Sequence, residues 1–276
     1  MDNRTLRKSL DCDLLGHHRI ARNARPLPNH LLQQTAALFI GFPSYSAQQA
    51  AAAEHWRSPT SQTSAWGSPP MAETLHDNAV EALKKMGYAH CVSPGPDIYV
   101  DIERSGCTDA VLPHLKDLST IHHLNLSRTQ VTDRIMEILQ AHPEIRELDI
   151  TDTKVGDEGL RFLPLAKSLE VLGLGSIEPP YESKITDAGI VHVAGLKALK
   201  HLDLFATAVT ADGLKVVGEL PSLECLGMSA KQVSEDSIAS LQRAPKLRKI
   251  ILIGAEDTDP VFIHLQKSLP NVAVVF

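Results

Sequence analysis

The sequence is poor in aromatic residues and in cysteine. Aromatic residues make up 4% of its 276 residues, with two Trp, four Tyr and six Phe. So few large rings favour a core of repeated aliphatic layers over one bulky centre. The four cysteines stand too far apart for a zinc-binding pair or for the clustered disulfides that cap secreted repeat proteins. They are Cys12, Cys91, Cys107 and Cys225. We therefore expect a reducing, cytoplasmic location.

Long apolar runs are also lacking. The longest candidate, Leu31–Phe42, is interrupted by two glutamines and a threonine, whereas a membrane helix needs roughly 20 apolar residues. Three arginines precede this segment and small residues follow it at 44–53, which is the order of a signal peptide. It lies deep in the chain for such a signal. No membrane association is expected, and export remains the alternative if the segment around 31–53 is an internal or mis-started signal peptide.

Positive charge is scarce outside the first 70 residues. The chain carries a net charge of −6, and residues 1–70 hold seven Lys and Arg against four Asp and Glu. The remainder holds 20 against 29, a net charge of −9. Such a field repels phosphate backbones, so a nucleic-acid ligand is not expected.

The first 96 residues differ in pattern from the rest. Residues 1–70 show no sustained period, and from 43 to 70 Ser, Ala, Gln, Thr, Pro and Gly dominate. Too little apolar area is available there to offset chain entropy, which predicts a disordered or weakly ordered segment. Residues 71–96 form a cap: apolar residues at helical spacing up to Met86, Gly87 as the helix end, and a short strand over Tyr88–Val92.

Beyond residue 97 the chain repeats itself. The unit reads Leu-x-x-Leu-x-Leu-x-x-Thr-x-Val-Thr-Asp-x-Gly-Leu-x-x-Leu-x-x-Leu, with steps of 24, 24, 24, 30, 24 and 24 residues. The seven units begin at Asp97, Ile121, Ile145, Leu169, Leu199, Leu223 and Leu247. Their paired aliphatic residues, such as Leu148/Ile150 and Leu172/Leu174, predict one buried strand a unit.

Two polar positions recur after each strand. The expected helix N-caps are Thr108, Thr132, Thr186, Thr210, Ser234 and Thr258, with Gly156 as the exception. An aspartate usually follows, where it favours the positive end of a helix. The ninth position, where a side chain can bond the turning backbone, holds Ser105, Thr129, Thr153, Ile177, Thr207, Lys231 and Ala255. Because the last two and Ile177 carry no hydroxyl, we expect a looser C-terminal end.

This pattern resembles the leucine-rich-repeat family, in particular the bacterial Thr-x-Val-Thr-Asp-x-Gly-Leu variety, which is akin to ribonuclease-inhibitor-like and F-box-type repeats. The resemblance covers 97–276. It implies an α/β fold: a leucine-rich-repeat solenoid, or horseshoe, of about seven units, with a concave parallel sheet, short convex helices, an N-terminal helical cap and a C-terminal cap strand. No unit of such an array is stable alone.

If the paired leucines point inward, the residues between them lie on the concave face. Its N-terminal half is polar and mostly acidic, and its C-terminal half presents an aromatic residue and two isoleucines as exposed partner contacts. The predicted partner-binding residues are Tyr99, Asp101, Glu103, His123, Asn125, Glu147, Asp149, Tyr181, His201, Asp203, Phe205, Ile251 and Ile253. Coverage of the apolar members by the N-terminal segment or by a neighbouring molecule is the alternative.

Tyr181 belongs to an insertion, not to the sheet. Six extra residues within 177–184 lengthen the fourth unit, and Pro179 and Pro180 would stiffen a loop on its rim. Such loops often carry recognition, and a neutral insertion is the equal alternative.

Two groups of residues could in principle carry chemistry. His123 with Asp101, Glu147 and Asp149 could approach one metal, although no pair of ligands at typical metal spacing supports this over a solvated polar face. Cys225 beside His201 resembles a nucleophile with its general base, but the pair would lie on a sheet face without a pocket. No phosphate-binding glycine loop or Gly-x-Ser-x-Gly turn is present. We expect neither catalysis nor a metal or cofactor.

The sequence therefore predicts a monomeric, non-enzymatic module that binds another protein on the concave face. A substrate-recognition adaptor of a larger enzyme complex is the alternative, although no F-box-like helical segment is visible before residue 71. A third class, an enzyme or inhibitor, would have its active element within residues 1–70.

Overall fold

The computed structural model describes residues 71–88, 98–103, 105–176, 183–256 and 258–275, all within one compact unit. Three predictions lie wholly or mostly outside the described residues: the disorder of 1–70, the strand over Tyr88–Val92, of which Tyr88 alone is described, and the loop that carries Tyr181.

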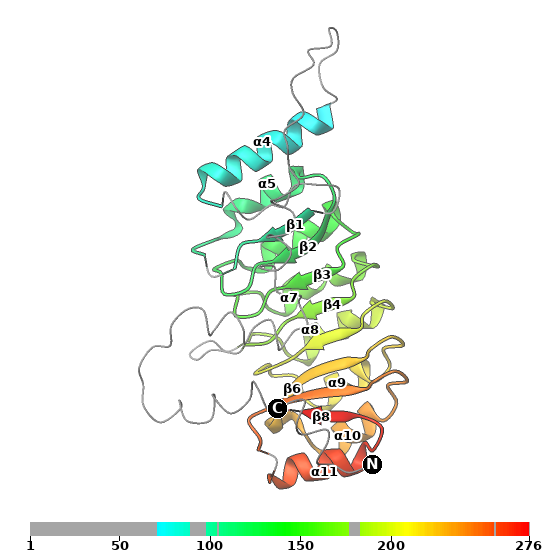
Figure 1. Ribbon diagram of the computed structural model, residues 1–276. Helices are drawn as coiled ribbons and strands as arrows, with labels where there is room; N and C mark the ends of the chain where they lie inside the picture. Colours follow the sequence, from blue (N-terminus) through cyan, green and yellow to red (C-terminus); the bar gives the residue numbers. More distant parts are fainter. Residues whose placement is uncertain (1–70, 89–97, 104, 177–182, 257, 276) are drawn as a thin grey trace, which may run out of the picture. The chain divides into compact units, whose positions relative to one another are not determined.

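The described strands form a single sheet of eight parallel strands in sequence order, so that each strand pairs with the next along the chain (Figure 1). The strands are β1 (Ile98–Asp101), β2 (Ile121–Asn125), β3 (Glu147–Asp149), β4 (Val171–Gly173), β5 (His201–Asp203), β6 (Cys225–Ser229), β7 (Lys249–Ile253) and β8 (Ala273–Val275). Strand β2 begins at the expected start of its unit, β1 begins one position after it, and β3 to β7 each begin two positions after it. The predicted final edge strand is β8.

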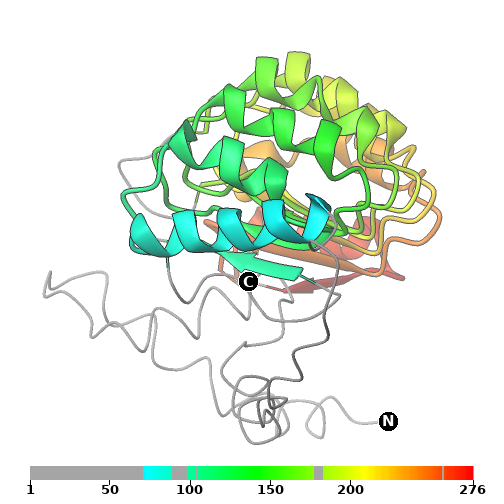
Figure 2. The same ribbon diagram turned by 90° about the horizontal axis from the view of Figure 1, so that it is seen from above.

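Short helices return the chain from each strand to the next and form a second layer on one side of the sheet (Figure 2). The α-helices are α4 (Met71–Lys85), α5 (Leu112–Asp117), α6 (Ile138–Ala141), α7 (Asp157–Leu160), α8 (Asp187–Ile190), α9 (Ala211–Val217), α10 (Glu235–Leu241) and α11 (Pro260–Ser268). The 3-10 helices cover Asp109–Val111, Asp133–Glu137, Leu163–Leu165, Val191–Gly195 and Ala230–Gln232. None of the described helices is both long and apolar enough to cross a membrane.

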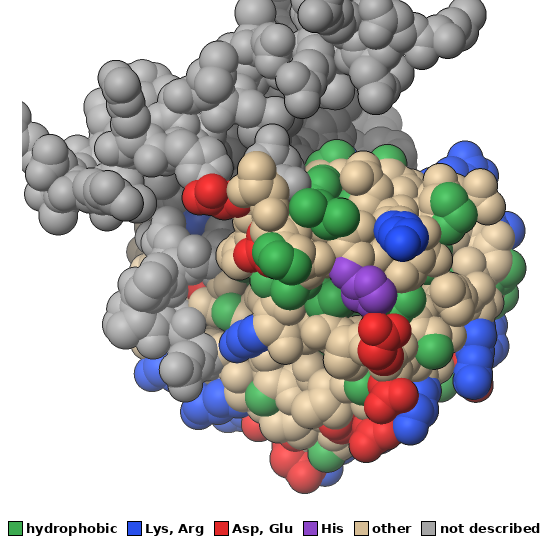
Figure 3. Space-filling view, turned by 90° about the horizontal axis from the view of Figure 1, so that it is seen from below, with side chains coloured by type: hydrophobic (Ala, Val, Ile, Leu, Met, Phe, Trp, Pro, Cys, Tyr) green, Lys and Arg blue, Asp and Glu red, His purple; other side chains and the backbone are tan. Residues whose placement is uncertain are grey.

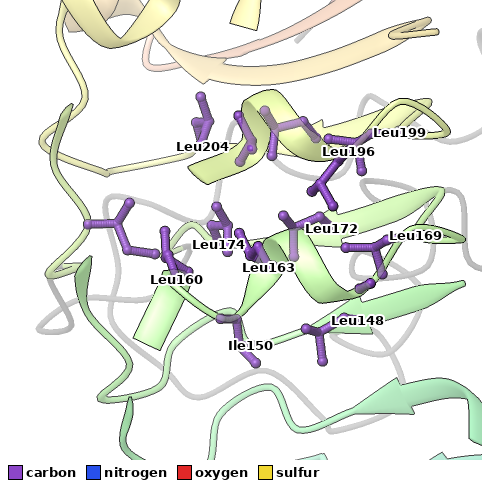
Figure 4. Packing of buried hydrophobic residues seen from close by; sticks show 14 of the residues in the cluster. Leu148, Ile150, Leu160, Leu163, Leu169, Leu172, Leu174, Leu196, Leu199 and Leu204 are labelled. Carbon is purple, nitrogen blue, oxygen red and sulfur yellow. The ribbon is translucent and has the colours of Figure 1, made fainter. Parts of the chain in front are cut away.

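The paired aliphatic residues of all seven units face the interior between the two layers. Each of the fourteen is at most 2% exposed. Leu148, Leu172 and their equivalents stack from strand to strand, and helix residues such as Leu160 and Leu163 pack against them (Figure 4). The predicted solenoid, with one continuous aliphatic core shared between neighbouring units, is confirmed.

The two ends of the array are closed differently. Helix α4 is the predicted N-terminal cap: Ala79 and Leu83 are buried in the core, and the Ser119 backbone N–H donates to His76 Nδ1 at 3.2 Å. At the other end, β8 pairs with β7, and Ile263 of α11 remains 53% exposed. Figure 3 views this end, where hydrophobic side chains are scattered among charged ones.

Hydroxyl groups at the ninth position bond the turn that leaves the strand in the first five units. The side chains of Thr129, Thr153 and Thr207 donate to the carbonyl oxygen three residues earlier, at 2.6, 2.7 and 2.8 Å. In the fourth unit this role belongs to Ser183, which donates to the Leu174 carbonyl at 3.2 Å. Our assignment of the position to Ile177 was wrong, because the insertion precedes the hydroxyl residue and moves it six places along the chain.

The sixth unit replaces the hydroxyl with an amide. Gln232 Nε2 donates to Thr207 Oγ1 at 3.0 Å and to the Val209 carbonyl at 3.2 Å, while its Oε1 accepts from the Ser229 N–H at 2.8 Å. A longer side chain therefore bridges back to the fifth unit, which works against the looseness expected from Lys231.

Most of the predicted helix caps are present. Thr108, Thr186 and Thr210 accept from the N–H two residues on, and Ser234 accepts from Ser237. Two predictions need correction. Thr132 stands at the N-cap position but accepts no capping N–H, and its hydroxyl donates to Asp109. The cap of α11 is Asp259 and not Thr258, since Pro260 sets the first helical position one residue later.

Candidate functional site

The candidate site is the sheet face opposite the helices, which we call the open sheet face. Its side chains alternate with the buried leucines, as strand geometry requires. The row that precedes the second leucine of each unit consists of Tyr99, His123, Glu147, Val171, His201, Cys225 and Lys249. The first six are half-buried and Lys249 is exposed.

Three of the predicted residues meet at the N-terminal end of this row. Tyr99, His123 and Glu147 are register partners on β1, β2 and β3. The Tyr99 and His123 rings stack with centroids 5.5 Å apart and an interplanar angle of 28°. Nδ1 of His123 lies 3.0 Å from Oε2 of Glu147. Strand pairing therefore assembles an aromatic pair and a carboxylate from residues 24 positions apart.

The field around this group is negative. The pKa of the Tyr99 phenol is raised, first by burial and then by the nearby carboxylates of Asp101 and Glu147. Burial also raises the pKa of Asp101. Glu103 contacts a cation, since Arg128 Nη1 lies 2.8 Å from its Oε1. The predicted acidic character of this half of the face is thus present.

The row between the paired leucines has a structural role that sequence reasoning missed. Asp101, Asn125, Asp149 and Asp203 each accept the backbone N–H two residues on, at 3.2, 3.0, 2.9 and 2.8 Å. These are Asx turns, in which a short side chain satisfies the backbone that leaves the strand. The recurrence of Asp or Asn at one position of the unit was the signal that could have revealed them.

Two of these aspartates are buried on the open sheet face. Asp149 is 4% exposed and Asp203 is 5% exposed. Burial raises the pKa of Asp149 to about 6 and that of Asp203 to about 8, against the hydrogen bonds that lower them. A raised pKa means that the protonated form is favoured by loss of hydration.

The expected exposed apolar contacts need correction. Phe205 is fully buried, and Ile251 is only 5% exposed, while Ile253 is half-buried. The ring of Phe205 packs over Gly227: a Cβ built on that glycine would lie 2.7 Å from its Cζ. Because Gly227 has no side chain, the neighbouring aromatic ring folds down on the strand and does not project from it.

The two candidate chemical sites are the pair of His201 and Cys225 and the group around His123. His201 and Cys225 are register partners on β5 and β6, but burial raises the pKa of the Cys225 thiol, which disfavours the thiolate a nucleophile needs. Within the described residues no group of three or more His, Cys, Asp or Glu could hold a metal ion. His123 contacts Glu147 and Tyr99 directly.

Comparison with known families agrees with the geometry. Residues 142–163, which run from the end of α6 through β3 and α7, match the family model described as Leucine Rich repeat. The fold is a leucine-rich-repeat solenoid. The match covers one unit, and the remaining units of the leucine-rich-repeat array follow from the register of the strands and the shared core. No curated protein matches the sequence.

Proposed function

We propose that this leucine-rich-repeat protein is a non-enzymatic module that binds another protein through its open sheet face. Leucine-rich repeats in general mediate protein–protein interaction. The observation that carries the proposal is the row of Tyr99, His123 and Glu147, three half-buried side chains held in contact on adjacent strands.

Such a row suits a protein partner. Tyrosine is enriched at the energetically dominant positions of protein interfaces, because a rigid amphipathic ring loses little entropy on binding. Strand pairing and stacking already hold these side chains in place, so less side-chain entropy is lost when a partner binds. The acidic surroundings, with Asp101 and Glu103 beside Tyr99, favour a basic protein surface over a nucleic acid.

The non-enzymatic part of the proposal is supported by the state of Cys225. Its pKa is raised by burial, and Asp203 raises it further, whereas catalytic thiols have lowered pKa values. Lys249 opposes this shift without reversing it.

The test is affinity capture with the full chain from a lysate of its source cells. The open-face variant combines Tyr99→Ala with Glu147→Gln, and the matched control is Glu158→Gln on α7, whose side chain is 79% exposed. A partner captured by the wild type and the control should be lost with the open-face variant, and calorimetry with that purified partner should show at least a tenfold weaker affinity, equal to roughly 1.4 kcal/mol. Equal capture by all three proteins would contradict the proposal.

The same experiment addresses the adaptor alternative. An adaptor holds a second, enzyme-bearing partner at a different surface. Such a partner would still be captured by the open-face variant, whereas the substrate would be lost.

A further inference from the structure

The surroundings of Asp203 are unusual for a buried carboxyl group, because glycine stands on both sides of it. Its register partners are Gly173 on β4 and Gly227 on β6. A Cβ built on Gly227 would lie 3.0 Å from Asp203 Oδ1, and one built on Gly175 would lie 3.1 Å from the same atom. Neither neighbouring strand therefore contributes a side chain at the level of this carboxyl group on the open sheet face.

Only one oxygen of Asp203 has a hydrogen-bond partner within the described part of the chain. Oδ1 accepts the Phe205 N–H at 2.8 Å. Oδ2 is buried and makes no hydrogen bond with any described residue. Since Asp203 alternates with the core residues Leu202 and Leu204, this oxygen belongs to the open sheet face. A buried acceptor without a partner is unfavourable and calls for a donor.

The charges that face Asp203 are of its own sign. Asp149 on β3 and Asp152 in the turn after β3 both act on it as like charges. On its own strand lies His201, and on β6 the Cys225 thiol. Arg128, the nearby cation, acts on Asp149 and lies 3.7 Å from Asp152. Within the described residues, a negative charge on Asp203 is thus not offset by a cation.

We propose that Asp203, together with Asp149 across Gly173, receives an arginine or lysine side chain of the bound protein partner. This inference rests on the proposed function and names the partner chemistry of the same face. The cation would supply both the missing donor to Oδ2 and the missing positive charge.

The spacing favours a side chain over a metal ion. Asp149 and Asp203 are separated by one strand, which places their Cα atoms about 10 Å apart at a strand spacing of roughly 4.8 Å. Calcium and magnesium require six or more oxygens close around one point, whereas guanidinium presents five N–H donors in a planar fork. The Asp149 carboxyl group leans over Gly173, where a Cβ would lie 2.6 Å from its Oδ1, so an arginine above that strand can reach both carboxylates.

The experiment uses three probes on the full chain: N-acetyl-arginine amide, the uncharged N-acetyl-citrulline amide, and Mg²⁺ alone. Two NMR signals are followed, the carboxyl carbon of Asp203 and the backbone amide of Phe205, which bonds to it. The arginine probe should shift both and lower the pKa of Asp203 by at least about one unit, because an opposite charge at contact stabilises the ionised form. Citrulline amide and Mg²⁺ should leave both signals unchanged.

Asp203→Asn is the variant, and Glu219→Gln, an exposed acidic residue after α9, is its control. Asparagine keeps the turn, as Asn125 does with the Ser127 N–H at 3.0 Å, so the fold is expected to persist and is checked by circular dichroism. In Asp203→Asn the Phe205 amide should no longer respond to the arginine probe, whereas the control should respond as the wild type does.

Three results would overturn the inference: no response of the wild type to the arginine probe, an equal response to citrulline amide, or an equal response in Asp203→Asn. A response to Mg²⁺ in place of arginine would replace it with a metal site. None of these results contradicts the proposed function, which is tested separately by partner capture with the Tyr99→Ala and Glu147→Gln variant. Partner capture that is unchanged in Asp203→Asn would likewise overturn only the inference.

Discussion

The carboxylate of Asp187 accepts two hydrogen bonds from Thr210, which lies one unit further along the chain. Oδ1 accepts the Thr210 backbone N–H at 2.8 Å, and Oδ2 accepts its hydroxyl at 2.6 Å. The same pairing joins Asp109 to Thr132 and Asp157 to Thr186. The aspartate that follows the helix cap in each of the first four units therefore links its unit to the next.

Removal of this link should destabilise the array. In Asp187→Ala the Thr210 N–H and hydroxyl and the Gly213 N–H lose their acceptor. We expect the free energy of unfolding to fall by about 1–3 kcal/mol, the usual cost of such losses, as measured by urea denaturation. Asp212→Ala is the control, because among the described residues this exposed side chain bonds just Lys215 of its own helix. Equal midpoints for the two variants would contradict the role of Asp187.

Glycine stands two residues after Asp157 and after Asp187, and in both cases its Cβ position lies against the aspartate of the preceding unit. A Cβ on Gly189 would lie 2.3 Å from Asp157 Oδ1 and 2.9 Å from its Cα. Although alanine usually favours a helix over glycine by about 1 kcal/mol, we expect Gly189→Ala to lower the thermal midpoint, because the clash involves backbone. Gly106→Ala, with open space around its Cβ, should change the midpoint little. A stabilised Gly189→Ala would refute this explanation of the motif.

Much of this architecture could be predicted from the sequence, because a 24-residue period places the same residue in the same environment each time. The inward aliphatic pairs follow from that period, whereas the helical cap follows from apolar residues at helical spacing before the repeat and β8 from the resemblance to the family. Contacts between units did not follow from it. The bond from Asp187 to Thr210 joins residues 23 positions apart, and a pattern read along one unit shows only that both residues recur.

The sequence predictions that proved wrong on the sheet face have a common physical cause. Alternation predicts the side of the sheet to which a residue points, but exposure depends on the neighbouring strands. Phe205 lies on the predicted face, yet Gly227 beside it leaves room for the ring to pack down. Asp203 lies on the same face and is buried. In the fourth unit, counting from the start of the repeat gave Ile177, whereas Ser183 makes the bond.

The burial of Phe205 changes the expected outcome of its substitution. On an exposed contact, Phe205→Glu would weaken partner binding without unfolding. With the side chain fully buried, the variant places a carboxylate beside Asp203, and we expect a loss of stability of about 3 kcal/mol or more, measured by denaturant titration. Phe205→Leu, which keeps apolar volume, should lose less than half as much. If Phe205→Glu were as stable as the wild type, Phe205 would have to be an exposed contact, as the sequence predicted.

Truncation of the shared core tests the solenoid directly. Leu172 is 1% exposed and pairs in register with Leu148 and Leu202. Leu172→Ala should cost about 2–5 kcal/mol, because the cavity is enclosed by the units on both sides. The exposed Leu165, at 43%, provides the control Leu165→Ala, for which a loss below about 1 kcal/mol is expected. Equal losses would mean that the inward face is assigned incorrectly.

The buried aspartates predict an unusual dependence of stability on pH. The pKa of Asp203 is about 8 in the folded protein, raised by burial from 3.8, and that of Asp149 is about 6. Between pH 4 and 8 the folded state therefore binds more protons than the unfolded state, so the free energy of unfolding should fall as the pH rises through this window.

Asp203→Asn isolates this contribution. The amide keeps an acceptor for the Phe205 N–H and cannot ionise. Urea denaturation across pH 5–8 should show a shallower decline for the variant, and at pH 8 the variant should be the more stable protein. Asp212→Asn serves as the control, because its pKa is lowered by Lys215 at an exposed site and it should retain the wild-type decline. If Asp203→Asn and the wild type lost stability in parallel over this range, Asp203 would not be the group that titrates.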